Sequence, residues 1–301
     1  MSDCEKLRKQ LKHRVYSKKL MPEQCRENYE CFFNDVFLPN EVECATEQVA
    51  GENVLVLTPM VKNAKQCVLY FHGGFFEIGT QKSYTGFCAS LANACQAEVV
   101  LPEIAPAYEK PFPFQLEAAY RVYRGLQQSG RFAGYHFVFA GDGSGATLCF
   151  ALALYVLDKE KKLPLGIAVM SPLVDLQIKK IKHKDELLSL ELFERYVKNY
   201  AGDKDTANPL ISPSLAELSV LKKFPAVFVQ AIRDEYLFDQ INTFVSQLEK
   251  AGVTIETENF SSEMTMFQLF PDACKTAHLA VESFAKKIME MFSHTFGEKD
   301  R

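Results

Sequence analysis

Short apolar runs rich in β-branched residues alternate with longer helical stretches from about residue 50 to the end of the chain. The runs read NVLVLTP, CVLYF, AEVVLP, HFVFAG, LGIAVMS, AVFVQA and TIETENF. Continuous apolar runs of this length indicate strands that are covered on both faces, and their alternation with helices is typical of a parallel sheet. The pattern therefore predicts an α/β fold, with a mostly parallel central sheet flanked by helices.

Amphipathic helical patterns precede and interrupt these runs. Leu7, Leu11 and Val15 recur every four residues, and Pro22 suits the first turn of a second helix. The apolar stripe of that second helix comprises Cys25, Tyr29, Phe32, Phe33 and Val36. A further helical pattern, KDELLSLELFERYVKNYAG, lies between the runs SPLVDL and NPLISP and ends near Gly202.

These helices have two interpretations. Ligands bind at the carboxyl edge of open α/β sheets, and the interrupting helix follows a strand end, so we interpret the helices as a cap over a site. Alternatively, they only cover the sheet. The predicted organisation is an N-terminal helical cap segment (1–44), a first core part (45–172), a cap insertion (173–209) and a second core part (210–301).

Composition narrows the function classes. The 34 basic and 38 acidic side chains give a net charge of −4, which does not indicate a nucleic-acid-binding surface. No run reaches the roughly 18 apolar residues of a membrane span, and the N-terminus lacks an apolar signal core. Nine cysteines, an odd number without paired CxxC spacing, indicate reduced thiols rather than a disulfide frame or a zinc site. We therefore expect a cytoplasmic protein without a nucleic-acid partner, membrane span, metal or cofactor.

A buried strand, a glycine turn and an apolar helix follow one another in FVFAGDGSGATLCFALAL. In serine hydrolases such a turn is the G-x-S-x-G elbow, and the residues two before and two after the nucleophile must be small. Gly141 and Gly145 satisfy both positions only when Gly143 is central. Centring the turn on Ser144 would place Asp142 in the crowded contact between strand and helix. The spacing therefore predicts a glycine where the attacking hydroxyl belongs.

The stretch VLYFHGGFFEIGT places a His-Gly-Gly loop directly after an apolar strand. It resembles the HGGG-type loop of lipases and esterases, whose glycines allow backbone N–H groups to bind an anionic oxygen. Gly73 and Gly74 are the matching glycines, and Phe75 replaces the third. We expect these residues, with Phe76, to line a ligand site.

Six blocks in order along the chain resemble the hormone-sensitive-lipase-like family of α/β-hydrolases, a carboxylesterase group with an N-terminal helical cap. They are HGGFFEIG, AYEKPFPFQLEAAYRVY, GDGSGA, the pair SPLVDL and NPLISP, IRDEYLFDQ, and SSEMTMFQLF. The resemblance implies the α/β-hydrolase fold with a helical cap. Homodimers are common in that family, so a homodimer is expected by analogy only.

Transferring the family's catalytic triad by position places the serine on Gly143, the acid on Asp234 and the histidine on Thr265. Only the acid is retained, and without an imidazole to orient, Asp234 either pairs with Arg233 or is solvated. Ser144, beside the nucleophile position, is the alternative nucleophile. No histidine is well placed as its base; the six are His13, His72, His136, His183, His278 and His294.

Three hypotheses remain open on the sequence. The first is an esterase-like pseudoenzyme that binds a small apolar ligand with a carboxylate or ester group near Gly73, Gly74 and Ser144, with Phe75 and Phe76 lining the apolar part. The alternative is a weak or atypical carboxylic-ester hydrolase that uses Ser144. The third is a scaffold with an empty pocket, whose cap is a surface for a protein partner.

Overall fold

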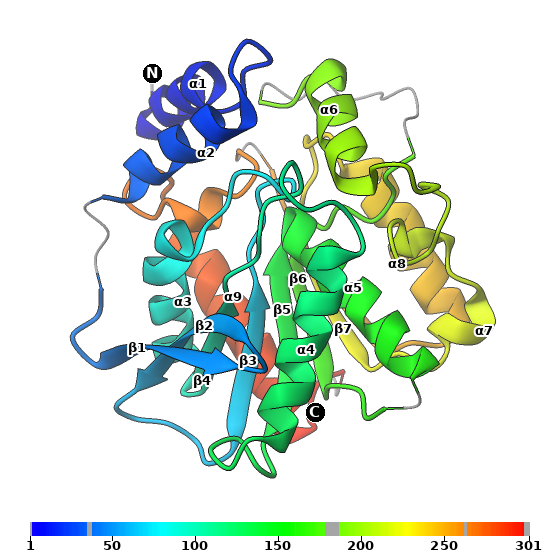
Figure 1. Ribbon diagram of the computed structural model, residues 1–301. Coiled ribbons are helices and arrows are strands. Elements are labelled where there is room, and N and C mark those ends of the chain that lie inside the picture. The colour runs from blue at the N-terminus through cyan, green and yellow to red at the C-terminus, as the bar shows by residue number, and fades with distance from the viewer. Residues whose placement is uncertain (1, 35–37, 160, 178–186, 262–263, 298–301) are drawn as a thin grey trace.

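The computed structural model describes residues 2–34, 38–159, 161–177, 187–261 and 264–297 of the chain. Within them, eight strands form one sheet in the order β1-β2-β4-β3-β5-β6-β7-β8 (Figure 1). The pairs β1–β2 and β2–β4 are antiparallel, and the other neighbouring pairs are parallel. The strands are β1 (Val42–Val49), β2 (Glu52–Pro59), β3 (Gln66–Phe71), β4 (Glu98–Pro102), β5 (His136–Asp142), β6 (Gly166–Met170), β7 (Ala226–Ile232) and β8 (Ile255–Phe260).

The mostly parallel α/β sheet predicted from the sequence is confirmed. The seven apolar runs coincide with β2 to β8. β1 was not predicted, because Val49 is its one buried residue and the strand therefore has no continuous apolar run. It is joined to β2 by a tight turn in which Ala50 and Gly51 both have positive φ angles.

Helices cover both faces of the sheet. α3 (Gln81–Cys95) and α9 (Ala277–Ser293) pack on one face (Figure 1). α4 (Phe114–Gln128), α5 (Gly143–Asp158) and α8 (Phe238–Ala251) pack on the other. α5 is apolar around most of its circumference and is buried along nearly its whole length. The shorter elements are η1 (Cys31–Phe33), η2 (Pro213–Leu215), α7 (Leu218–Leu221) and η3 (Phe267–Leu269).

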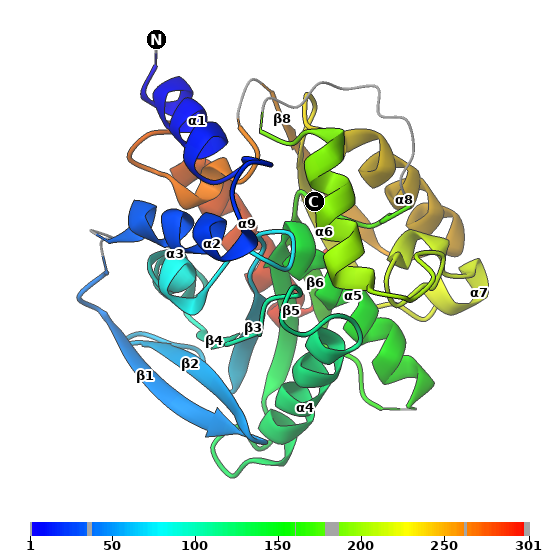
Figure 2. The same cartoon turned by 45° about the horizontal axis from the view of Figure 1, so that its top comes forward.

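Three further helices lie above the carboxyl ends of the parallel strands (Figures 1 and 2): α1 (Asp3–Arg14), α2 (Pro22–Glu30) and α6 (Leu190–Ala201). α1 begins in a capping box formed by Ser2 and Glu5, and Pro22 occupies the first turn of α2. The two parts of the predicted cap, far apart in sequence, therefore lie over the same edge of the sheet.

α6 is the described part of the helix predicted between the two core parts. Its N-cap residue is Ser189, whose hydroxyl accepts the Leu192 N–H, and Gly202 follows its last turn, as predicted. Val36 and residues 178–186, which include His183, lie outside the described residues. No helix in the described part of the chain is long and apolar enough to cross a membrane.

Candidate functional site

Gly143 is the residue at the apex of the turn between β5 and α5. Its φ angle is +48°, in the left-handed region. A Cβ atom on Gly141 would lie 2.6 Å from the Phe71 carbonyl oxygen, and one on Gly145 would lie 1.9 Å from the same oxygen. A Cβ atom on Gly143 would meet no atom within 4 Å. The strand–helix contact thus requires glycine on both sides of the apex, whereas the apex itself has room for a side chain.

The Ser144 hydroxyl is engaged inside the protein. Ser144 is 1% exposed. Its Oγ accepts a 3.0 Å hydrogen bond from the Phe76 N–H, which belongs to the segment that follows β3 (residues 72–80, here called the glycine loop). Ser144 therefore holds the glycine loop against the first turn of α5. To attack a substrate, this oxygen would also need a base to accept its proton.

Asp142, the last residue of β5, is a buried carboxylate with three hydrogen-bond donors. Its Oδ1 accepts from the Tyr70 hydroxyl at 2.8 Å and the Gly73 N–H at 3.0 Å, and its Oδ2 accepts from the Tyr84 hydroxyl at 2.7 Å. Burial raises the pKa of Asp142 to about 6, although the hydrogen bonds from Tyr84, Tyr70 and Gly73 oppose that shift. A Cβ atom on Gly73 would come within 2.1 Å of Oδ2, so this contact requires glycine in the loop.

The glycine loop continues through three residues with positive φ angles. They are Gly74 (+101°), Phe75 (+53°) and Phe76 (+63°). Phe75 stacks on Tyr196 with ring centroids 4.7 Å apart, and Phe76 stacks on Tyr200 with centroids 3.5 Å apart. Both tyrosines lie on one face of α6. The cap helix α6 thus holds the loop in a backbone conformation that residues other than glycine rarely adopt.

Glu77 joins the same loop to the cap from a fully buried position. Its carboxylate accepts a 2.6 Å hydrogen bond from Asn199 and lies 3.4 Å from Arg195, both on α6. Arg26 of α2 donates to the Glu77 carbonyl oxygen at 3.2 Å. Burial raises the pKa of Glu77, while Asn199 and Arg195 oppose the shift. This junction was missed from the sequence, because a single glutamate among apolar residues does not identify its partners.

Asp234 and Thr265 lie in loops at the same edge of the sheet as Gly143. Asp234 follows β7 and is exposed. Thr265 follows β8 and is half-buried between the buried side chains of Met264 and Met266. Because β5, β7 and β8 run parallel, the three positions share the carboxyl edge that carries ligand sites in α/β sheets.

The described histidines are distributed over the glycine loop, the start of β5 and the helices. His72, in the glycine loop, has its Nδ1 2.9 Å from the Gly73 carbonyl oxygen, and burial lowers the pKa of His72 to about 4. It is therefore neutral at pH 7. His136 begins β5 at the opposite edge, and His13, His278 and His294 are exposed on helices or at their ends.

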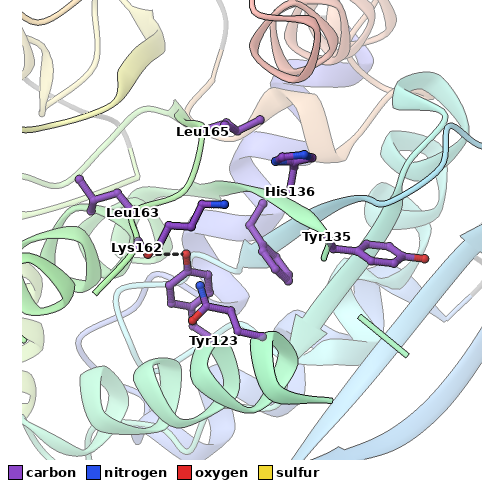
Figure 3. A pocket seen from close by; sticks show the side chains of 8 residues that line it. Tyr123, Tyr135, His136, Lys162, Leu163 and Leu165 are labelled. Carbon is purple, nitrogen blue, oxygen red and sulfur yellow. Dashed lines mark hydrogen bonds between the residues drawn. The ribbon is translucent and has the colours of Figure 1, made fainter. Parts of the chain in front are cut away.

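A small cavity lies at that opposite edge, beneath the start of β5 (Figure 3). Tyr123, His136 and Lys162 are among its lining residues, and the Tyr123 hydroxyl donates a 2.8 Å hydrogen bond to the Lys162 carbonyl oxygen. Its volume of about 20 Å³ holds roughly one water molecule. The cavity is therefore too small for an organic ligand.

Comparison with known proteins identifies the family. The sequence pattern of the alpha/beta hydrolase fold family matches residues 68–269, from β3 to η3. The chain belongs to this family. The match includes the glycine loop, the Gly143 turn and the loops of Asp234 and Thr265.

Relatives of this alpha/beta hydrolase include an esterase and an acetyl-hydrolase. The chain is 29% identical over 237 residues to an esterase of Acinetobacter venetianus, covering 75% of this chain and 76% of that one. It is 27% identical over 220 residues to an acetyl-hydrolase of Streptomyces hygroscopicus, covering 71% and 72%. A solved esterase of the bacterial hormone-sensitive lipase family superposes with a TM-score of 0.87 at 21% identity, covering 96% of this chain and 98% of that one.

These similarities confirm the predicted α/β-hydrolase fold and the resemblance to esterases of the hormone-sensitive lipase family. In this alpha/beta hydrolase, the turn that follows β5 has two features that bear on function. The apex residue carries no side chain, and the neighbouring hydroxyl is bonded to the glycine loop.

Proposed function

We propose that this alpha/beta hydrolase binds a small apolar ligand with a carboxylate or ester group at the carboxyl edge of its sheet, without hydrolysing it. The observation that carries the proposal is the turn itself. Gly143 occupies the apex of the turn, where an added Cβ atom would meet no atom within 4 Å. The Ser144 hydroxyl oxygen accepts a hydrogen bond from the Phe76 N–H. Thr265, at the position of the family's histidine, supplies no base. Asp234 stands at the position of the family's acid.

The size of the catalytic loss supports binding over turnover. Removing the serine or the histidine of a triad lowers kcat by roughly 10⁶-fold in a hydrolase where both were tested. The oxyanion hole and substrate binding alone leave roughly 10³–10⁴-fold over water. A site of this composition therefore retains the affinity of an esterase while losing almost all of its rate.

Backbone donors and aromatic rings supply the proposed binding groups. The Gly73 N–H is engaged by Asp142, but no acceptor is recorded for the Gly74 N–H among the described residues. We assign the head group of the ligand to Gly74 and to the N-terminal end of α5, whose helix dipole favours an anion. Phe75 and Phe76 line the apolar part. Gly73 and Ser144 shape this site through their hydrogen bonds to Asp142 and Phe76.

Ester hydrolysis through Ser144 is the second candidate function. The names of the relatives favour it, because both curated relatives described above are hydrolases of esters or acetyl groups. This candidate requires the Ser144 oxygen to leave the Phe76 N–H and to find a base that the described part of the site does not present. It predicts measurable turnover that depends on this one hydroxyl.

Hydrolysis of p-nitrophenyl acetate and p-nitrophenyl butyrate separates the two candidates. The assay compares the wild-type protein with Ser144→Ala and with Ser171→Ala, which removes another buried hydroxyl at the same sheet edge. We expect no turnover above background in all three proteins. Turnover that survives in Ser171→Ala but disappears in Ser144→Ala would establish the hydrolase instead.

Calorimetric titration with butyrate, and with butanol as the uncharged control, tests the binding itself. We expect saturable binding of butyrate and weaker binding of butanol, because the head-group site is built from N–H donors. Absence of both turnover and binding would contradict the proposal and favour the cap as a surface for a protein partner.

A further inference from the structure

One buried hydroxyl contacts three separate segments of the site. Tyr84, on α3, donates a 2.7 Å hydrogen bond to Asp142 Oδ2, at the Gly143 turn. The Tyr84 hydroxyl oxygen also accepts a 3.2 Å hydrogen bond from the Gly73 N–H of the glycine loop. It lies 3.9 Å from the sulfur of Met266, next to Thr265. Tyr84 is fully buried, so water does not replace these contacts.

Tyr70 also donates to Asp142 and can therefore be compared directly with Tyr84. Its hydroxyl donates a 2.8 Å hydrogen bond to Asp142 Oδ1, and this is its one recorded hydrogen bond within the described ranges. Oδ1 also accepts the Gly73 N–H, so loss of the Tyr70 hydroxyl would leave it with a donor. Loss of the Tyr84 hydroxyl would remove the donor of Oδ2 and a second acceptor of the Gly73 N–H. Two tyrosines thus share one carboxylate, but only one of them reaches the loops.

We propose that Tyr84 is a positioning residue, whose hydroxyl fixes both the glycine loop and the loop of Thr265 to the turn that carries Gly143. A tyrosine hydroxyl can donate and accept at once, which is what a junction between a carboxylate and an N–H requires. Hydrogen bonds to a buried charged group are stronger than those between neutral groups, so the junction is held firmly. The role in ligand affinity rests on the proposed function, whereas the role in loop order does not.

The junction is also where the site senses protonation of Asp142. Protonation removes the charge that the Tyr84 hydroxyl and the Gly73 N–H stabilise, and so loosens the glycine loop. The titratable groups that face Asp142 come from every neighbouring element: Tyr29 on α2, Tyr70 on β3, His72 in the glycine loop, Tyr84 and Cys88 on α3, and Cys149 on α5. Burial raises the pKa values of the four tyrosine and cysteine neighbours Tyr29, Tyr70, Cys88 and Cys149 and lowers that of His72, so these groups are neutral near pH 7.

Hydrogen–deuterium exchange followed by mass spectrometry tests the junction in the full chain. The variants are Tyr84→Phe and the matched control Tyr70→Phe. Each removes one tyrosine hydroxyl that donates to the Asp142 carboxylate and leaves the aromatic ring unchanged. At pH 7 we expect exchange in Tyr84→Phe to rise about tenfold in two peptides, one covering 72–80 and one covering 264–270. Tyr70→Phe should leave the second peptide unchanged and affect the first less.

A pH profile distinguishes positioning from simple loss of packing. After correction for intrinsic exchange, protection of the 72–80 peptide in wild type should follow the titration of Asp142. Its midpoint should move to higher pH in Tyr84→Phe, and by less in Tyr70→Phe, because the Tyr84 hydrogen bond is the stronger stabiliser of the carboxylate. Equal effects of the two variants, or a 264–270 peptide that ignores Tyr84→Phe, would overturn the proposal.

Titration with butyrate separates failure of this inference from failure of the proposed function. If wild type does not bind butyrate but both peptides respond more strongly to Tyr84→Phe than to Tyr70→Phe, the function is wrong and the positioning role stands. If wild type binds butyrate, we expect Tyr84→Phe to weaken that affinity about tenfold and Tyr70→Phe to weaken it less. Binding that is equal in both variants would contradict the positioning role while leaving the function intact.

Discussion

The Phe76 N–H donates a 3.0 Å hydrogen bond to the Ser144 hydroxyl, across a separation of 68 residues in the sequence. The bond joins the glycine loop to the first turn of α5. Ser144 is buried, and its hydroxyl is engaged by this loop within the protein. In this chain the hydroxyl has a structural partner.

Replacing Ser144 with alanine should therefore affect stability rather than chemistry. The variant leaves the buried Phe76 N–H without its acceptor, which costs about 1–3 kcal/mol. Urea denaturation should show this loss for Ser144→Ala, whereas Ser293→Ala, at an exposed site, should stay within about 0.5 kcal/mol of wild type. A Ser144→Ala protein as stable as the control would mean that the hydroxyl is free to act elsewhere.

The two glycines that flank the apex give a second prediction, on the geometry of the turn. Gly145→Ala would place a Cβ atom 1.9 Å from the Phe71 carbonyl oxygen, which is backbone and cannot move aside cheaply. We expect a loss of more than about 3 kcal/mol or failure to fold. Gly130→Ala is the control, because its Cβ atom would meet no atom within 4 Å. A tolerated Gly145→Ala would show that β3 and α5 are less closely packed than described.

The sheet and the turn could be predicted from the sequence, because each depends on residues that are close together along the chain. The strands from β2 to β7 are largely apolar runs, and the glycines at positions 141 and 145 reflect a close approach of two backbones. β1 carried no such signal, because most of its side chains are partly or fully exposed. The fold could therefore be predicted almost completely, except at the edge where one face meets solvent.

The polar network of the site could not be predicted in the same way. Asp142 is recognisable in the sequence only as a residue too large for a crowded position, and its partners Tyr70 and Tyr84 lie 72 and 58 residues away. Glu77 finds Arg195 and Asn199 more than 100 residues later. Hydrogen bonds between distant segments follow from the packed fold and not from any local pattern.

The Glu77 junction between the loop and the cap gives a third prediction. Glu77→Ala leaves the partly buried Arg195 without its carboxylate and should destabilise the protein by about 3 kcal/mol. Glu52→Ala, which breaks the more exposed pair with Arg121, should cost at most about 1 kcal/mol. Urea denaturation measures both losses. Hydrogen exchange should rise in α6 for Glu77→Ala only, and equal losses in the two variants would argue against the junction.

Asp142 gives a prediction about pH. Its pKa is about 6 in the folded protein against the usual 3.8, so between pH 4 and pH 6 the folded state binds one more proton than the unfolded state. The free energy of unfolding contributed by this group therefore falls as the pH rises through that window, by roughly 2–3 kcal/mol. Asp142→Asn cannot titrate. Its stability should decline less than that of wild type from pH 4 to pH 7, and parallel curves for the two proteins would contradict the raised pKa.

Positions 143 and 265 give the last prediction, on whether a serine and a histidine there would produce ester hydrolysis. A serine at position 143 meets no atom within 4 Å of its Cβ, and its positive φ costs about 1–2 kcal/mol of strain. A triad member acts only with its partners, so Gly143→Ser and Thr265→His should each remain inactive singly. The double variant should hydrolyse p-nitrophenyl acetate, while Gly143→Ala with Thr265→His, which has the same backbone strain but no hydroxyl, should not. A folded double variant without activity would contradict the proposal that these two side chains decide the activity, and would point to the packing of Phe75 and Phe76 against α6 as what closes the site to esters.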